Sequence, residues 1–285
     1  MESDFEATNL DRAERLANRD ATPTEQKPDL EFNFEATKFE RSWTVDALQG
    51  FYQDGWFTEV LYRVKSGKEA TVYCCRANPE TGYDLVAAKI YRHRRLRSMQ
   101  NYAAYQTGRT ITTDKRLQRA MKKKTATGKE TEDNAWLAHE FSTMELLHFK
   151  GADVPRPLAP GANSMLMEFV GDSAQAGPTL HEVELDPETA QIFFHRLIDN
   201  VSLMLGNHYI HGDLSAYNIL YWQDDFKIID FPQAVDPMHN PSAFSILARD
   251  IERLCQYFGR FGVEAHAMDI TENLWKRYQR GELYR

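Results

Sequence analysis

The chain has 285 residues, a formal net charge of −8 at pH 7, 42% hydrophobic residues and 27% charged residues. This composition is typical of a globular protein, and the length suffices for one large domain or two lobes. No apolar run reaches the roughly 18 residues that a membrane-spanning helix needs, and the acidic N-terminus lacks an apolar signal core, so we expect a cytoplasmic protein without a membrane partner.

The N-terminal part of the chain is polar and acidic. Residues 1–40 hold eleven acidic and five basic side chains and show little apolar periodicity. Segments of this kind bury too little apolar surface to offset the entropy of ordering the chain. We therefore predict a largely disordered tail over residues 1–40.

The next part of the chain, residues 41–170, is predicted to form a small lobe rich in strands. A short helix is expected around Val45–Asp54. The stretches "FTEVLYRV", "ATVYCCRA" and "DLVAAKIYR" predict an antiparallel meander, because "NPETGY" between the last two carries turn-forming Pro and Gly. Apolar residues at helical spacing predict a helix over "TEDNAWLAHEFSTMELLHFKG", and "SMLMEFVG" predicts a buried strand.

A strongly basic segment, residues 92–130, interrupts this lobe between the third strand and the long helix. Residues 89–129 contain thirteen Lys and Arg side chains and a single acidic one, Asp114. One interpretation is a solvated loop and helix face. The other is a docking surface for a polyanion, such as RNA, a ribosomal particle, ATP phosphates or an acidic protein.

The last part, residues 171–285, is predicted to be mostly helical. A helix over "DPETAQIFFHRLIDNVSLMLGN" has Asp186 as its N-cap and Pro187 in its first turn. The stretches "ILYW" and "FKIIDF" predict a strand pair, and two amphipathic helices follow, the second at about Ile270–Arg280. The chain thus predicts a small β lobe followed by a helical lobe.

The stretch "YIHGDLSAYNILYW" places a carboxylate, Asp213, and an amide, Asn218, among apolar residues, and Asp230 ends the apolar stretch "KIID". Burying such groups without partners costs a few kcal/mol or more. Their oxygens suit Mg²⁺ or Mn²⁺, and phosphoryl transfer requires a carboxylate beside the incoming hydroxyl and ligands for the metal on the phosphates. Alternatively, Asp213 and Asn218 could simply cap turns.

Two further features favour phosphoryl transfer. Lys89 interrupts the apolar strand "VAAKIY", and a lysine that points inward needs an anionic partner. In the protein-kinase signature such a lysine meets the nucleotide phosphates and a helix glutamate, for which Glu140 is a better candidate than Glu132 or Glu145 on the same helix. The stretch "VKSGKEATVY" lies where a phosphate loop is expected, although only Gly67 of the usual three glycines is present.

Together, the stretches "SGKEATVY", "AAKIYR", "HGDLSAYNILY" and "IIDFPQAVD" resemble the RIO family of atypical serine protein kinases, from about Phe57 to Gly262. The resemblance implies an α+β, two-lobed protein-kinase-like fold with a small antiparallel β lobe and a reduced helical lobe. It also implies binding of ATP with Mg²⁺ or Mn²⁺. The implied activity is phosphoryl transfer to serine or threonine of an unknown protein substrate, or an ATPase switch in small ribosomal subunit maturation.

The same resemblance gives the motif residues their expected roles. Asp213 is the catalytic carboxylate, Asn218 and Asp230 are metal ligands, and Asp230 is itself a candidate for transient phosphorylation. The expected ATP-binding residues form the phosphate loop, the lysine–glutamate pair and the hinge "MEFVG"; they are Ser66, Gly67, Lys68, Glu69, Lys89, Glu140, Met167, Glu168 and Val170. The backbones of Glu168 and Val170 would contact adenine. Met167 would line the adenine pocket or serve only as a core residue. Ser98 in the basic segment is a candidate self-phosphorylation site.

Two alternative functions remain open. Aminoglycoside and choline kinases share H-G-D-x-x-x-x-N, although "SGKEA", "DFPQ" and the lack of a large helical insert count against a small-molecule phosphotransferase. The other alternative is a nucleotide-gated, non-enzymatic assembly factor that binds RNA or a ribosomal particle.

No A-P-E motif follows "DFPQ", and the interval from Asp230 to Pro241 is too short for the peptide-binding segments of ordinary protein kinases. The position of a peptide substrate is therefore left open.

Overall fold

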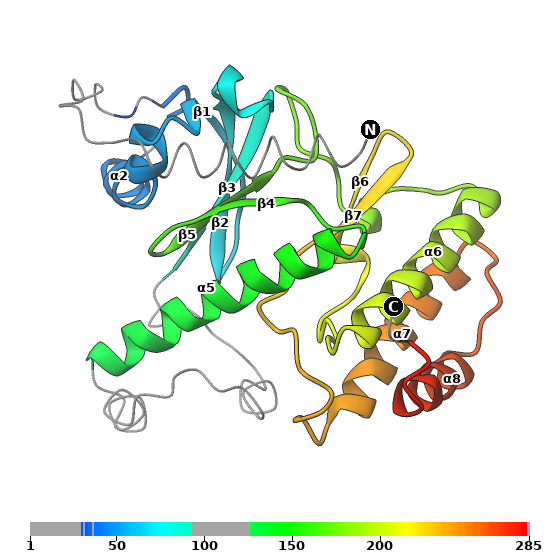
Figure 1. Ribbon diagram of the computed structural model, residues 1–285. Helices are drawn as coiled ribbons and strands as arrows, with labels where there is room; N and C mark the ends of the chain where they lie inside the picture. The colour runs from blue at the N-terminus through cyan, green and yellow to red at the C-terminus, as the bar shows by residue number, and fades with distance from the viewer. Residues whose placement is uncertain (1–29, 31, 36, 93–125, 284–285) are drawn as a thin grey trace.

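A five-stranded antiparallel sheet with the order β1-β2-β3-β5-β4 forms the small lobe (Figure 1). The computed structural model describes residues 30, 32–35, 37–92 and 126–283. The strands are β1 (Phe57–Ser66), β2 (Ala70–Ala77), β3 (Leu85–Tyr91), β4 (Pro157–Pro160) and β5 (Ser164–Glu168), and a 3₁₀ turn, η1 (Pro79–Thr81), joins β2 to β3. Four of these strands were predicted. The fifth, β4, was missed because its two prolines are atypical of strands, although an edge strand tolerates them.

Side chains of β3 alternate between two different cores. Val86, Ala88 and Ile90 pack in the core of the small lobe, together with residues of helix α2 (Lys38–Gln53). The intervening Ala87 and Tyr91 belong to the core shared with the large lobe. Because successive strand residues point to opposite faces, Lys89 is directed to the second face, toward the other lobe.

Part of the segment before α2 packs on the small lobe, which differs from the predicted disordered tail. Residues 1–29 lie outside the described residues, but Leu30 is buried and Phe32 forms a parallel bridge with Val60 of β1. The Phe34 ring lies 5.9 Å from that of Tyr73, and α2 begins at Lys38. The prediction of a disordered tail as far as residue 40 was therefore wrong for its last residues, because isolated aromatic side chains can dock on a neighbouring strand without any periodicity of their own.

Helix α5 (Ala126–Phe149) runs beneath the sheet and toward the large lobe (Figure 1). It starts earlier than the sequence pattern indicated, and Gly151 follows it in the left-handed conformation at φ 84°, as is common after helices. Residues 93–125, which make up most of the basic segment and include Ser98, lie outside the described residues. The docking surface and the self-phosphorylation site therefore stay predictions.

The large lobe is mainly helical. It contains α6 (Pro187–Gly206), α7 (Ala243–Gly259), α8 (Ala267–Gln279), the hairpin β6 (Ile219–Trp222)–β7 (Asp225–Ile228) and the 3₁₀ turns η3 (Leu180–Glu182) and η4 (Ala216–Asn218). As predicted, Asp186 caps α6, accepting hydrogen bonds from the N–H groups of Glu188 and Thr189, each at 3.0 Å. The α+β, two-lobed kinase-like fold is confirmed. Among the described residues no helix is long and apolar enough to cross a membrane.

Candidate active site

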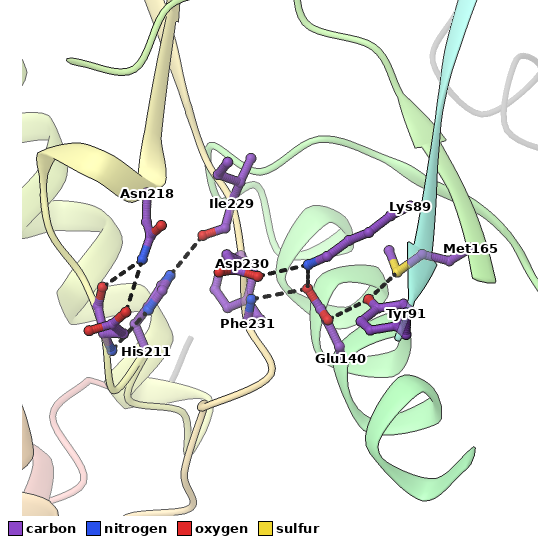
Figure 2. A network of polar contacts seen from close by, with 10 residues as sticks. Lys89, Tyr91, Glu140, Met165, His211, Asn218, Ile229, Asp230 and Phe231 are labelled. Atoms are coloured by element: carbon purple, nitrogen blue, oxygen red, sulfur yellow. Dashed lines mark hydrogen bonds and ion pairs between the residues drawn. The ribbon is translucent and has the colours of Figure 1, made fainter. Parts of the chain in front are cut away.

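Three elements bring a lysine and two carboxylates together between the lobes. The Lys89 ammonium on β3 lies 2.7 Å from Glu140 Oε1 on α5 and 2.7 Å from Asp230 Oδ1, just after β7. Figure 2 shows these side chains pointing toward one another. Burial disfavours the charged lysine, but the carboxylates of Asp230 and Glu140 outweigh it and raise the pKa of Lys89 well above its usual value. The three groups together carry a net charge of about −1.

Glu140 joins these elements through further hydrogen bonds. Its carboxylate is fully buried and also accepts hydrogen bonds from the Phe231 N–H, at 3.2 Å, and from the Tyr91 hydroxyl. The Tyr91 hydroxyl lies 3.1 Å from the sulfur of Met165 on β5. The contribution of Tyr91 was not foreseen, although its position two residues after Lys89 on the same strand face is a usable signal.

The loop that carries Asp213 is fastened to the chain just before Asp230. The Asn218 Nδ2 donates to the Asp213 carbonyl at 2.9 Å, and the Ile229 N–H donates to the Asn218 carbonyl at 2.9 Å. His211 Nε2 lies 3.1 Å from the Ile229 carbonyl, and its Nδ1 lies 3.3 Å from the Asp213 N–H. These two contacts fit a neutral imidazole that donates from Nε2, and burial lowers the pKa of His211 accordingly.

Asp230 adopts a backbone conformation that side chains rarely take. Its φ is 73°, in the left-handed region, where aspartate is tolerated better than larger or branched residues. The ion pair with Lys89 lowers the pKa of Asp230, although burial opposes this. Because its side chain is 39% exposed, the carboxylate remains accessible to a ligand.

Helix α7 supports the predicted catalytic loop with charged side chains that sequence reasoning missed. The carboxylate of Asp250 is buried and accepts the Gly212 N–H at 2.7 Å, while the Arg249 guanidinium donates to the Gly212 carbonyl. Arg253 Nη1 lies 2.7 Å from Asp213 Oδ1. Burial raises the pKa of Asp250 to about 7. The only sequence signal for these contacts with the Asp213 loop is that charged residues interrupt the apolar stripe of α7.

The predicted phosphate loop is a tight turn between β1 and β2. The Gly67 N–H donates to the Ala70 carbonyl at 2.9 Å. Arg92 holds both sides of the turn: its Nη2 donates to Ser66 Oγ at 2.7 Å, and its N–H donates to the Glu69 carbonyl at 2.8 Å. Arg92, which the sequence places in the basic segment, therefore anchors the predicted phosphate loop instead.

The predicted hinge lies at the end of β5. Met167 is 9% exposed and pairs with Ala87 of β3, so its side chain lies on the sheet face directed to the other lobe. The Glu168 N–H donates to the Arg156 carbonyl, and the Val170 carbonyl accepts the Gly177 N–H, each at 2.8 Å. The Glu168 N–H is therefore engaged within the protein, whereas the Val170 carbonyl can accept a second hydrogen bond. The backbone groups still expected to contact adenine are the Glu168 carbonyl and the N–H and carbonyl of Val170.

The predicted metal ligands have chemistry that suits Mg²⁺. Because Asn218 donates through its amide nitrogen, its oxygen is left for a cation, and Asp230 adds a carboxylate. Within the part of the chain that the structure describes, no three His, Cys, Asp or Glu side chains are grouped to hold a metal. Mg²⁺ is usually bound by one or two carboxylates together with substrate phosphates and water, so this sparse set fits.

Comparison with known proteins identifies the family. The RIO domain model matches residues 71–272 of the chain. The chain belongs to the RIO family. The match begins just after the predicted phosphate loop, so the expected roles of Ser66 to Glu69 rest on the sequence motif and not on this domain match.

Named RIO relatives are similar over much of the chain. The RIO-type serine/threonine-protein kinase Rio1 of Haloferax volcanii is 29% identical over 273 residues, covering 92% of this chain and 86% of the relative. The serine/threonine-protein kinase RIO1 of Chaetomium thermophilum is 31% identical over 220 residues, covering 73% of this chain but 40% of the relative.

Solved RIO structures share the fold. The crystal structure of the Rio2 kinase–ADP/Mg²⁺–phosphoaspartate complex from Chaetomium thermophilum has a TM-score of 0.59 at 20% identity, covering 87% of this chain and 74% of that chain. A second Rio2 kinase structure from the same organism has a TM-score of 0.57 at 21% identity, covering 84% and 72%.

Proposed function

We propose that this RIO-family chain is an ATP- and Mg²⁺-dependent serine/threonine kinase of the RIO type. The observation that carries the proposal is the buried Lys89, held at 2.7 Å by Glu140 from α5 and by Asp230 from the segment after β7. A lysine that is fixed between the lobes and backed by two carboxylates supports a phosphate-binding role. The names of the relatives, RIO-type serine/threonine-protein kinases, point to the same activity.

Each side chain then has a defined task. Lys89 contacts the ATP phosphates, and Asn218 and Asp230 hold the metal, which neutralises phosphate charge when bound. Asp213 orients the acceptor hydroxyl and accepts its proton as the hydroxyl oxygen bonds to the γ-phosphorus and the bond to ADP breaks. Arg253 holds the Asp213 carboxylate in place at 2.7 Å.

A second route uses Asp230 itself. The similar Rio2 kinase from Chaetomium thermophilum was solved as a phosphoaspartate complex, and the resemblance of the chain to this family makes Asp230 the candidate for the same modification. A carboxylate oxygen would bond to the γ-phosphorus as ADP leaves, and water would then hydrolyse the acyl phosphate to phosphate and free Asp230. The exposure of this side chain supports such a route, which would make the chain an ATPase switch.

The products of ATP turnover distinguish the candidate functions. ATP labelled in its γ-phosphate is incubated with the full chain and Mg²⁺, with and without protein acceptors or ribosomal particles. Labelled phosphoprotein supports a kinase, and free phosphate alone supports the ATPase switch. Tight ATP binding without any turnover would reject both and leave a nucleotide-gated assembly factor. Family membership does not favour the small-molecule phosphotransferase.

The domain division and partners complete the proposal. We place the small lobe at residues 41–170 and the helical lobe with the catalytic loop at residues 171–285. Before the small lobe, Phe32 contacts β1 and Phe34 contacts β2. ATP and a protein acceptor are the proposed partners. Binding of RNA or a ribosomal particle through the basic segment, and a cytoplasmic location, remain sequence-based proposals.

A further inference from the structure

We infer that the acceptor side of Asp213 is a binding site for an anionic side chain, so that the chain prefers acceptor segments with a carboxylate or phosphoryl group near the reacting hydroxyl. This inference rests on the proposed kinase function and adds a substrate class to it. It starts from a hollow of about 500 Å³ in the large lobe that Asp213 and Asn218 line together with Arg253, Arg260, Tyr217 and His181. Among the residues that the structure describes, none of the small lobe lines it.

The lining of this hollow carries more positive than negative charge. Among the described residues that line it, only Asp213 is acidic, whereas Arg253 and Arg260 both carry guanidinium groups. The Arg253 charge is matched by Asp213 at 2.7 Å. The Arg260 charge is only weakly neutralised within the described protein, so an incoming anion can pair with it.

Arg260 follows α7 as its C-cap residue and is held by aromatic rings rather than by a strong ion pair. Its guanidinium carbon lies 5.6 Å from the centroid of the Tyr257 ring and 5.5 Å from that of Phe261. The carboxylate of Glu184 lies 3.7 Å away on a side chain that is 86% exposed. Such an exposed pair contributes little, so an incoming anion can replace it. The stacking keeps the guanidinium ordered, which suits recognition of a carboxylate or phosphate.

The hollow is also lined by a stacked pair of rings that an extended acceptor segment could contact. The rings of His181 and Tyr217 stack with centroids 4.1 Å apart, and the Tyr217 hydroxyl lies 3.0 Å from His181 Nε2. Tyr217 is nevertheless 55% exposed. An acceptor segment that contacts this ring and brings its hydroxyl to Asp213 would occupy the hollow that Arg260 also lines. This placement beside the catalytic carboxylate favours a protein acceptor over a nucleic acid.

The test measures the binding of matched serine peptides by the full chain, with Mg²⁺ and a non-hydrolysable ATP analogue, using fluorescence anisotropy. The peptides differ only in the residues beside the serine, which are glutamate, glutamine, phosphoserine or lysine. The parent chain is expected to bind the glutamate peptide about three- to tenfold more tightly than the glutamine peptide, as one charge-assisted contact provides. A phosphoserine peptide that binds more tightly still identifies a phosphoryl group as the preferred ligand, and weaker or equal binding identifies a carboxylate.

Substitutions of Arg260 test whether this side chain causes the preference for acidic peptides. Arg260→Glu should abolish the preference for glutamate and favour the lysine peptide, and Arg260→Gln should bring the ratio of affinities close to one. Arg280→Glu makes the same charge change at the C-cap of α8, on a side chain that is 69% exposed and does not line the hollow, and should keep the parent ratio. Equal binding of the glutamate and glutamine peptides by the parent, or equal effects of the two Glu variants, would overturn the inference.

Phosphorylation of the same peptides separates this inference from the proposed function. Turnover of labelled ATP without any preference for acidic peptides rejects the inference and leaves the kinase function intact. Selective binding of acidic peptides with no release or transfer of the γ-phosphate rejects the kinase function, while the anionic site stands as a binding site.

Discussion

Replacing Tyr91 by phenylalanine removes one hydroxyl from the most deeply buried part of the site. That hydroxyl donates to Glu140 Oε2, and the Glu140 carboxylate is completely buried. The other oxygen keeps Lys89 at 2.7 Å and the Phe231 N–H at 3.2 Å. A buried charged acceptor that loses a donor costs about 1–3 kcal/mol. For a chain of this size, that corresponds to a fall in Tm of roughly 2–4 °C per kcal/mol.

The matched control is Tyr221→Phe, which removes the same atom from a hydrogen bond of 2.7 Å to the Asp224 carboxylate at the surface. Because water replaces that contact, its cost should be near zero. Urea unfolding and thermal melting of the two variants measure the difference directly. Equal destabilisation by the two substitutions would refute the argument that burial of Glu140 makes the Tyr91 hydroxyl important.

Three further outcomes follow from the site. Lys89→Ala should weaken ATP binding in calorimetry about tenfold or more, since a charge-assisted contact in a dry cleft is lost; unchanged affinity would reject its phosphate role. Asp230→Ala should abolish the dependence of ATP affinity on Mg²⁺ concentration, and a retained dependence would mean that another group holds the metal. Burial raises the pKa of Asp250 to about 7, so the folded state binds more protons than the unfolded state between about pH 4 and 7, and stability should fall as pH rises through this window. Asp250→Asn keeps an oxygen for the Gly212 N–H and should gain in stability relative to the parent as pH rises; a pH-independent difference would contradict the assignment.

Local sequence patterns predicted most of the fold, because strand alternation and helical spacing reflect which face of an element is buried. They failed at β4, where two prolines mask an edge strand, and at Phe32, which docks on β1 without any periodicity. Both exceptions depend on neighbours that only the folded chain supplies.

The candidate site was predicted through its motifs, and what was missed lies outside them. Asp250 and Arg253 reach the catalytic loop from α7, nearly forty positions further along the chain, so only tertiary packing brings them there. Arg92 begins the basic segment in the sequence, but its side chain contacts Ser66 of the predicted phosphate loop. Sequence spacing cannot tell a cation that docks a polyanion from one that anchors this loop, because both would directly follow β3.

The most direct test of the account compares ATP binding with phosphoryl transfer in Asp213→Ala. Asp213 lies outside the Lys89–Glu140–Asp230 cluster and, by our assignment, acts only on the acceptor hydroxyl. Calorimetry with an ATP analogue and Mg²⁺ should therefore give nearly the parent affinity. Single-turnover transfer of the labelled γ-phosphate to a protein acceptor should slow by about 10²–10⁴-fold, as expected for loss of a positioned base. Transfer at the parent rate with unchanged ATP affinity would contradict the account.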